Sequence, residues 1–201
     1  MKKLSLIGFL GISFFAFSQN VKPADDRTKD EKALLVKTDQ SELEAKKKAA
    51  EEKTRLPKPY DPNADAEKDI QNLIAKAKKE NKNIMIQAGG NWCIWCLRFN
   101  QFVQTTPELK KLVDANYEYY HLNYSPDNKN EKIFAKFGNP GDKFGYPVFI
   151  VLDKNGKMIH VQQSDVLEEG KGYSLEKVKE FFSHGLQKII INPGHFRLIF
   201  S

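Results

Sequence analysis

Cysteine is scarce in this chain: two of its 201 residues are cysteines, and two are tryptophans. The sequence has no Gly-rich phosphate-binding loop, so we expect no nucleotide or flavin cofactor. A second CxxC pair is also missing and His160, His184 and His195 are dispersed, which disfavours a zinc site. Leu97 rather than histidine follows the second cysteine, which disfavours attached haem. We therefore expect no metal and no cofactor.

Charge of one sign does not dominate the sequence. The 32 basic and 26 acidic side chains give a formal net charge of +6, which falls to +4 if Lys2 and Lys3 are removed with the N-terminus. The lysines are interleaved with acidic residues, as at 42–52, and no basic stripe with interleaved aromatic residues is visible. We therefore expect a solvated surface and no nucleic-acid partner.

Residues 1–18 have the layout of a secretory signal peptide. Two lysines precede an apolar run at 4–17, and small residues at Ala16 and Ser18 favour cleavage before Gln19. The run is too short to span a bilayer comfortably, and an uncleaved membrane anchor is the alternative interpretation. The sequence thus predicts a periplasmic or secreted protein that has no membrane span after cleavage.

Residues 19–60 are rich in Lys, Glu, Ala, Asp and Gln and poor in apolar residues. We interpret them as a charged linker, disordered or partly helical at 41–53, that does not bury enough surface to fold alone. Several prolines end this segment and place a domain boundary near Tyr60, so we expect the folded domain at 61–185. Residues 186–201 form an apolar tail to which we assign no function.

The domain alternates helical and strand-like patterns. The expected helices lie at 65–80, at 97–103, from Thr106 onward, at 129–137 and from Ser174 onward, and the expected strands lie at 84–88, 117–123, 147–152 and 157–162. Thr106 supplies a capping hydroxyl, and proline follows it at the first helical position. Strands separated by helices predict parallel pairing, and a hairpin turn at 153–156 adds an antiparallel strand. The pattern predicts an α/β fold.

Cys93 and Cys96 lie where a hydrophobic run ends and a helical segment begins. The first turn of a helix offers unpaired N–H groups and the positive end of the dipole, and both favour thiolate over thiol. A thiolate attacks a disulfide, and a second cysteine one turn away can resolve the mixed disulfide. A purely structural disulfide is the alternative, although closing so short a loop removes little chain entropy. The spacing favours thiol–disulfide exchange.

Several short motifs follow one another along the domain. They are Trp92-Cys93-Ile94-Trp95-Cys96, Lys136-Phe137-Gly138, Gly145-Tyr146-Pro147 and the hairpin Asp153-Lys154-Asn155-Gly156-Lys157. In this order they resemble the thioredoxin superfamily. The resemblance covers roughly residues 65–184. It implies an α/β three-layer sandwich with a mixed central sheet and helices on both faces.

The resemblance also implies roles for individual residues. Cys93 would be the exposed nucleophile and Cys96 the shielded resolving thiol, with Trp92 packed beside the pair. Pro147 would be cis, as proline readily permits, and would lie against the cysteines. The backbone at Tyr146 would then pair with an extended substrate segment without demanding one sequence. We also expect Trp95, between the cysteines, to lie on the surface as part of the binding face.

Three departures from the family pattern affect the chemistry. Ile94 and Trp95 replace the Gly-Pro of the commonest reductases, so the redox potential does not carry over from them. Gln87 occupies the position where thioredoxins hold a buried aspartate, and an amide does not accept a proton as a carboxylate does. His121 on the next strand is a candidate for proton transfer in its place, with a structural role as the alternative. Third, residues 139–144 make the chain between Gly138 and Gly145 longer than in the minimal fold, and they form either a plain surface loop or a wall of the substrate groove.

Together these features predict an exported thiol–disulfide oxidoreductase that reduces or isomerises disulfides in cell-envelope proteins. Its partners would be disulfide-containing protein substrates and an electron-donor thiol protein, and we expect a monomer. Net disulfide oxidation is an alternative within the same class. A thioredoxin-fold binding or chaperone-like module, in which the cysteines do not turn over, is the alternative from another class.

Overall fold

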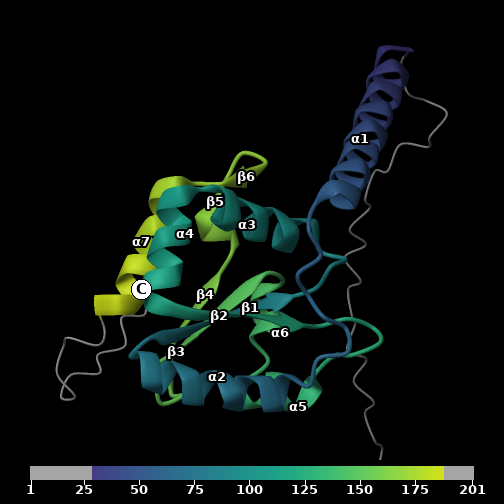
Figure 1. Cartoon of the computed structure of the whole chain (residues 1–201). Helices are drawn as coiled ribbons and strands as arrows, with labels where there is room; N and C mark the ends of the chain where they lie inside the picture. Colours follow the sequence, from purple (N-terminus) through teal and green to yellow (C-terminus); the bar gives the residue numbers. More distant parts are fainter. Residues whose placement is uncertain (1–28, 188–201) are drawn as a thin grey trace, which may run out of the picture. The chain divides into compact units, whose positions relative to one another are not determined.

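The computed structural model of the chain describes residues 29–187 (Figure 1). Internal contacts divide the chain into two units, residues 1–47 and residues 48–201. The described part of the first unit belongs to helix α1 (Lys29–Arg55), on which Leu34 and Leu43 are exposed. The expected signal peptide at 1–18 and most of the apolar tail lie outside the described residues.

The linker prediction needs two corrections. Helix α1 is continuous over Lys29–Arg55, longer than the expected partial helix at 41–53, because its Ala, Glu and Lys residues all favour helix. The unit that contains the sheet begins at Lys48, earlier than the expected boundary near Tyr60. Polar contacts cause this difference, since Glu52 and Tyr60 bond to residues of the sheet and of the helix that follows the cysteines. Hydrophobic periodicity does not detect such contacts.

Within the described residues, the second unit is built on a four-stranded sheet in the order β2-β1-β3-β4. The strands are β1 (Asn83–Gly89), β2 (Tyr117–Asn123), β3 (Val148–Leu152) and β4 (Met158–Gln163). β1 pairs in parallel with β2, whereas β3 pairs antiparallel with both β1 and β4. The sheet is therefore mixed, as expected. The prediction that all helix-separated strands pair in parallel was wrong for β3.

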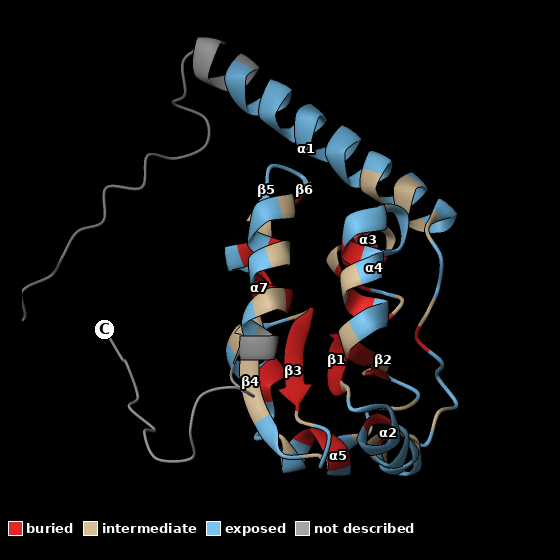
Figure 2. Cartoon of the chain, turned by 60° about the vertical axis from the view of Figure 1, so that its left-hand side comes forward, coloured by how far each residue is buried: buried red, intermediate tan, exposed pale blue. Residues whose placement is uncertain are grey.

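Helices cover both faces of this sheet (Figures 1 and 2). One face carries α3 (Ile94–Thr105), α4 (Pro107–Asn116) and α7 (Leu175–Gln187), and the other carries α2 (Ala66–Glu80) and α5 (Glu131–Lys136). The buried strand β1 alternates between two cores, with Met85 in the first and Ile84 and Ile86 in the second. Burial of β1 and β3 on both faces explains why each reads as a continuous apolar run.

Local sequence signals account for the helix ends. The Asp65 carboxylate accepts a hydrogen bond from the Lys68 N–H and caps α2, which ends at Asn81 in the left-handed conformation (φ 56°). Pro107 opens α4 as expected, but the Thr106 hydroxyl makes no capping hydrogen bond within the described residues. The capping role predicted for that hydroxyl was therefore wrong.

Four short elements were not predicted. The segment at 139–144 contains a short helix, α6 (Pro140–Phe144), rather than a plain loop. After β4, the 3₁₀ turn η1 (Asp165–Leu167) leads into a small hairpin of β5 (Glu168–Glu169) and β6 (Gly172–Tyr173). Elements of two to five residues are too short to show a period in the sequence.

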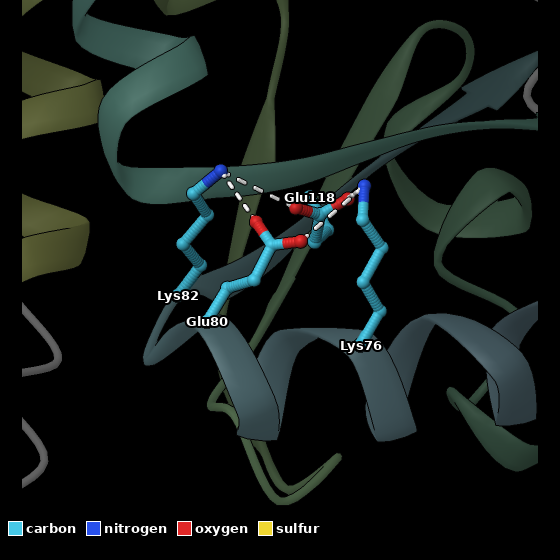
Figure 3. Close-up of polar contacts among 4 residues, drawn as sticks. All are labelled: Lys76, Glu80, Lys82 and Glu118. Atoms are coloured by element: carbon cyan, nitrogen blue, oxygen red, sulfur yellow. Dashed lines mark hydrogen bonds and ion pairs between the residues drawn. The ribbon is translucent and has the colours of Figure 1, made fainter.

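A buried carboxylate ties the edge strand β2 to α2 (Figure 3). Glu118 is 7% exposed, and its oxygens lie 2.6 Å from Lys76 Nζ and 3.4 Å from Lys82 Nζ. Glu80 also pairs with Lys82, at 2.9 Å. The hydrogen bond to Glu118 raises the pKa of Lys76. The two lysines thus compensate the negative charge of Glu118, which lies between β2 and α2.

We expect Glu118→Gln to lower the free energy of unfolding by about 1 kcal/mol, because the variant replaces a charge-assisted hydrogen-bond acceptor with a neutral one. Chemical denaturation at neutral pH measures the change. The exposed Glu108, which pairs with Lys179, provides the control variant Glu108→Gln, for which we expect a smaller effect. Equal effects of the two variants would contradict a special role of the buried carboxylate.

Candidate active site

The two cysteines form a disulfide at the start of α3. Cys93 is the N-cap residue of this helix, and the Cys96 N–H donates a hydrogen bond to Cys93 Sγ at 3.1 Å. The Cys93 N–H in turn donates to the Gly90 carbonyl at 3.1 Å, which closes the turn between β1 and α3. The sulfur of Cys93 therefore lies at the positive end of the helix dipole, as the sequence predicts.

The two sulfur-bearing residues differ in burial, although less than expected. Cys96 is fully buried, whereas Cys93 keeps 6% of its surface exposed. The prediction of an openly exposed Cys93 was therefore wrong in degree. Cys93 is less exposed than predicted because Trp95 and Tyr146 pack against the cluster that contains the disulfide. Cys93 remains the more accessible of the two.

The segment before β3 reaches the disulfide from the other side. The Tyr146–Pro147 peptide bond is cis, and Pro147 is buried. The carbonyl oxygen of Tyr146 lies 3.6 Å from Cys93 Sγ. The register of the sheet explains this proximity, since Ala88 near the end of β1 pairs with Val148 at the start of β3. The structure thus brings Cys93, Tyr146 and Pro147 together.

Trp92 lies beside the disulfide and is 47% exposed. Its indole Nε1 donates a hydrogen bond to the carbonyl oxygen of Tyr124 at 2.6 Å, and its ring meets that of Tyr146 edge-on at 5.6 Å. The ring of Tyr124 also stacks on Tyr146 at 5.2 Å. Trp92 and Tyr146 therefore form one aromatic surface next to Cys93. Tyr124 was not among the predicted site residues.

Trp95 is more enclosed than predicted. Its ring meets Tyr173 of β6 edge-on at 5.7 Å, and the Arg98 guanidinium lies 5.0 Å from the ring centre. The Tyr173 hydroxyl also donates to the Trp95 carbonyl at 3.1 Å. Trp95 is consequently only partly exposed, because the unpredicted hairpin covers one side of it.

The last turns of α1 contact the backbone and side chains around both tryptophans. Arg98, which lies against Trp95, donates two hydrogen bonds to the Glu52 carboxylate, at 2.6 and 2.8 Å. Lys53 Nζ donates to the carbonyl oxygen of Trp92 at 3.3 Å. The hydrogen bond from Arg98 lowers the pKa of Glu52. Residues assigned from sequence to a linker therefore help to hold the segment at 90–96 that carries the cysteines, which we call the redox loop.

Gln87 lies directly behind the buried cysteine. Its amide nitrogen donates hydrogen bonds to the Cys96 carbonyl at 2.8 Å and to the Tyr60 hydroxyl at 2.7 Å. Its amide oxygen accepts a hydrogen bond from the Tyr119 hydroxyl at 2.7 Å. Gln87 therefore stands beneath Cys96, where the register argument places it. Its amide is engaged in fixed hydrogen bonds.

His121 pairs with Gln87 across β1 and β2. Its ring lies 5.1 Å from both the Tyr60 and the Tyr119 rings, and within the described residues its Nε2 is buried without a hydrogen-bond partner. Burial lowers the pKa of His121 from 6.5 to about 4, so the imidazole is neutral at pH 7. His121 is thus near the buried cysteine pocket, and its part in proton transfer stays a prediction.

A hollow of about 300 Å³ lies beside the aromatic surface. It is lined by residues of α5 and α6 together with the two tyrosines, namely Tyr124, Glu131, Phe134, Ala135, Asn139, Gly141, Asp142 and Tyr146. Gly141 permits a close approach, since a Cβ there would lie 2.2 Å from the Tyr146 hydroxyl oxygen. The segment at 139–144 therefore shapes the surface next to the cis-proline.

Comparison with known proteins agrees with this geometry. Residues 65–154 match the protein family described as thioredoxin-like. The unit that contains the sheet has a thioredoxin-like fold. A disulphide isomerase from Xylella fastidiosa Temecula1 matches with a TM-score of 0.56 and 22% identity, over 64% of this chain and 97% of that one. The predicted thioredoxin-superfamily fold is thereby confirmed.

The oxidised C-terminal domain of DsbD from Neisseria meningitidis matches with a TM-score of 0.43 and 18% identity, over 62% of this chain and 96% of that one. No curated protein matches the chain significantly.

No described helix combines the length and the apolar character that a membrane span requires. Groups of three or more His, Cys, Asp or Glu residues arranged to hold a metal are absent from residues 29–187.

Tyr60 is the main residue of the thioredoxin-like site that the sequence did not reveal. It is 1% exposed and belongs to the same cluster as Cys93 and Cys96. Asn91 fixes its backbone, because the Asn91 side chain accepts from the Tyr60 N–H at 3.2 Å and donates to the Tyr60 carbonyl at 2.7 Å. Tyr60 lies in a proline-rich segment without periodicity, so only these long-range contacts identify it.

We expect Gly89→Ala to destabilise the oxidised thioredoxin-like domain by about 1 to 3 kcal/mol, because a Cβ at this position would lie 2.5 Å from Cys96 Sγ. Chemical denaturation measures the change. Gly172→Ala is the matched control, since a Cβ there meets no atom within 4 Å. A loss of stability as large in the control as in Gly89→Ala would show that the contact with sulfur is unimportant.

The pKa of His121 predicts a dependence of stability on pH. The unfolded chain binds a proton near pH 6.5 and the folded chain only near pH 4, so stability is retained above pH 6.5 and lost as pH falls towards 4. We expect His121→Gln to reduce this loss by up to about 3 kcal/mol, measured by denaturation across this range. His184→Gln, at an exposed histidine, should leave the loss unchanged. Parallel pH curves for His121→Gln and the parent chain would contradict the prediction.

Proposed function

We propose that the protein is an exported thiol–disulfide oxidoreductase that reduces or isomerises disulfides in cell-envelope proteins. One observation carries the proposal: Cys93 Sγ is the N-cap of α3 and accepts a hydrogen bond from the Cys96 N–H at 3.1 Å. When the disulfide opens, the same N–H and the helix dipole stabilise a thiolate on Cys93. A stabilised, partly accessible thiolate is the attacking species in disulfide exchange.

The reaction is a two-step exchange through a mixed disulfide. The Cys93 thiolate attacks one sulfur of the substrate disulfide, and the other substrate sulfur leaves as a thiolate that takes up a proton. The Cys96 thiolate then attacks the Cys93 sulfur, which forms the Cys93–Cys96 bond and releases the second substrate thiolate. Two electrons pass from the protein to the substrate, and an electron-donor thiol protein returns them.

Substrate binding is assigned to the surface around Cys93. The exposed face of Trp92, the partly exposed Trp95 and the ring of Tyr146 supply apolar contact area. Pro147 orients the preceding backbone, so that an extended substrate segment pairs with the main chain at Tyr146. Binding through the main chain suits an enzyme that acts on many sequences, and the Xylella protein of similar fold is described as a disulphide isomerase.

The signal-like residues 1–18 support a periplasmic or secreted location, where protein disulfides form and need correction. In this assignment the segment from residue 19 to Lys47 links the export signal to a monomeric domain that begins at Lys48, and the tail at 186–201 is unassigned. Two alternatives are net disulfide oxidation and a binding or chaperone-like module without turnover. The reduction potential of the Cys93/Cys96 pair separates reductase from oxidase.

We expect Cys93→Ser to abolish reduction of a protein disulfide, at least a hundredfold below the parent chain, because no other thiolate is positioned for attack. Cys96→Ser should instead accumulate a covalent mixed disulfide with substrate, visible by non-reducing electrophoresis. Met158→Ser, an exposed position at the far end of β3 and β4, is the control and should retain activity. A binding module predicts unchanged function in Cys93→Ser, and that result would overturn the proposal.

A further inference from the structure

The buried cysteine must become a nucleophile in the second step of the proposed reaction. Cys96 is fully buried, so forming a thiolate there costs free energy unless a hydrogen-bond donor faces the sulfur. The donor that serves Cys93 is the Cys96 N–H, which points towards Cys93 Sγ. A separate donor is therefore required for Cys96 itself.

The Tyr60 hydroxyl group and the Cys96 sulfur both lie next to Gly89. A Cβ built on Gly89 would lie 2.5 Å from Cys96 Sγ and 3.1 Å from the Tyr60 hydroxyl oxygen. Both atoms thus approach the backbone at the end of β1, and glycine leaves the space between them free of a side chain. Tyr60, Cys93 and Cys96 also form one buried cluster.

The hydrogen-bond pattern shows which way the Tyr60 hydroxyl is used. The Gln87 amide group that faces Tyr60 also faces the Cys96 carbonyl, which is only an acceptor, so that group must be the NH₂. It follows that the Tyr60 oxygen accepts the hydrogen bond from Gln87. The hydroxyl hydrogen of Tyr60 is not used in this bond and can be donated elsewhere.

The groups around Cys96 are neutral at pH 7. Burial raises the pKa of Tyr60 and of Tyr119 well above 10, so both phenols keep their protons. Burial also keeps the His121 imidazole uncharged. Tyr60 therefore acts as a donor and not as a base, and it does so on the side of the pocket that Gly89 leaves open.

We propose that Tyr60 is a positioning residue for the resolving step, because its hydroxyl donates a hydrogen bond to the Cys96 sulfur once the disulfide is open. In the disulfide, the Cys96 sulfur is a neutral and weak acceptor. In the mixed disulfide, the thiol of Cys96 gives up its proton, which the substrate thiolate released in the first step takes up, and the negative Cys96 sulfur accepts the Tyr60 hydrogen bond. The thiolate then attacks the Cys93 sulfur of the mixed disulfide and releases the substrate thiolate, which takes up a proton.

The test measures the pKa of Cys96 directly. In the full chain carrying Cys93→Ser, Cys96 is the remaining thiol, and its thiolate absorbance in the ultraviolet is followed against pH. We expect Tyr60→Phe to raise the pKa of Cys96 by about one to two units, the effect of losing a hydrogen bond to a charged group. Tyr117→Phe is the matched control, because Tyr117 is a buried tyrosine whose hydroxyl donates to the Phe182 carbonyl. It should leave the pKa unchanged.

A second variant keeps the shape of the site. Replacing Tyr60 by difluorotyrosine makes the phenol a stronger donor without removing any contact, so the pKa of Cys96 should fall. An unchanged pKa in both Tyr60 variants, or an equal shift in Tyr117→Phe, would overturn the assignment. The role of Tyr60 in turnover rests on the proposed function, whereas its hydrogen bond to the Cys96 sulfur does not. Because the measurement uses no substrate, its failure is distinguishable from a failure of the enzyme assay.

Discussion

The hydrogen bond from the Cys96 N–H to Cys93 Sγ depends on a buried strand running directly into a helix. β1 ends at Gly89 and α3 begins at Ile94, so the cysteines occupy the first turn of a helix that the sheet holds in place. The antiparallel neighbour β3 starts beside the end of β1, which delivers Pro147 and the Tyr146 carbonyl to the same edge. A different strand order would separate the Tyr146 backbone from the two cysteines, because the pairing of β1 with β3 is what places them together.

Much of this arrangement is visible in the sequence. The continuous apolar runs of β1 and β3, the amphipathic pattern of α2 and the proline that opens α4 all predict their elements within a few residues. The direction of β3 is not visible, because a strand buried on both faces has the same pattern whether it runs parallel or antiparallel. Its pairing follows from the path of the chain through α5 and α6.

The parts of the site that sequence reasoning missed come from distant segments. Tyr60 lies before α2, the first helix predicted for the domain. Tyr124 follows β2, and Tyr173 belongs to a hairpin of two-residue strands. Tyr60 packs against the cysteines, Tyr173 contacts Trp95 through its ring and hydroxyl, and the Tyr124 carbonyl accepts a hydrogen bond from Trp92. None of the three tyrosines repeats at a helical or strand period. Tyr60 packs in one cluster with Cys93, together with Trp95 and Tyr146, and Tyr173 covers one side of Trp95, so Cys93 and Trp95 are less exposed than expected. Local patterns predict elements, whereas the accessibility of a sulfur depends on tertiary packing.

The position of Tyr60 has a consequence for where the protein can be cut. The match to the thioredoxin-like family begins at residue 65, and a truncated chain starting there would keep every strand of the main sheet and both cysteines. It would lose one wall of the sulfur pocket, both hydrogen bonds that join the Asn91 side chain to Tyr60, and one of the hydrogen bonds made by the Gln87 amide. Water would enter beside Cys96. The minimal redox unit is therefore larger than the sheet and its helices.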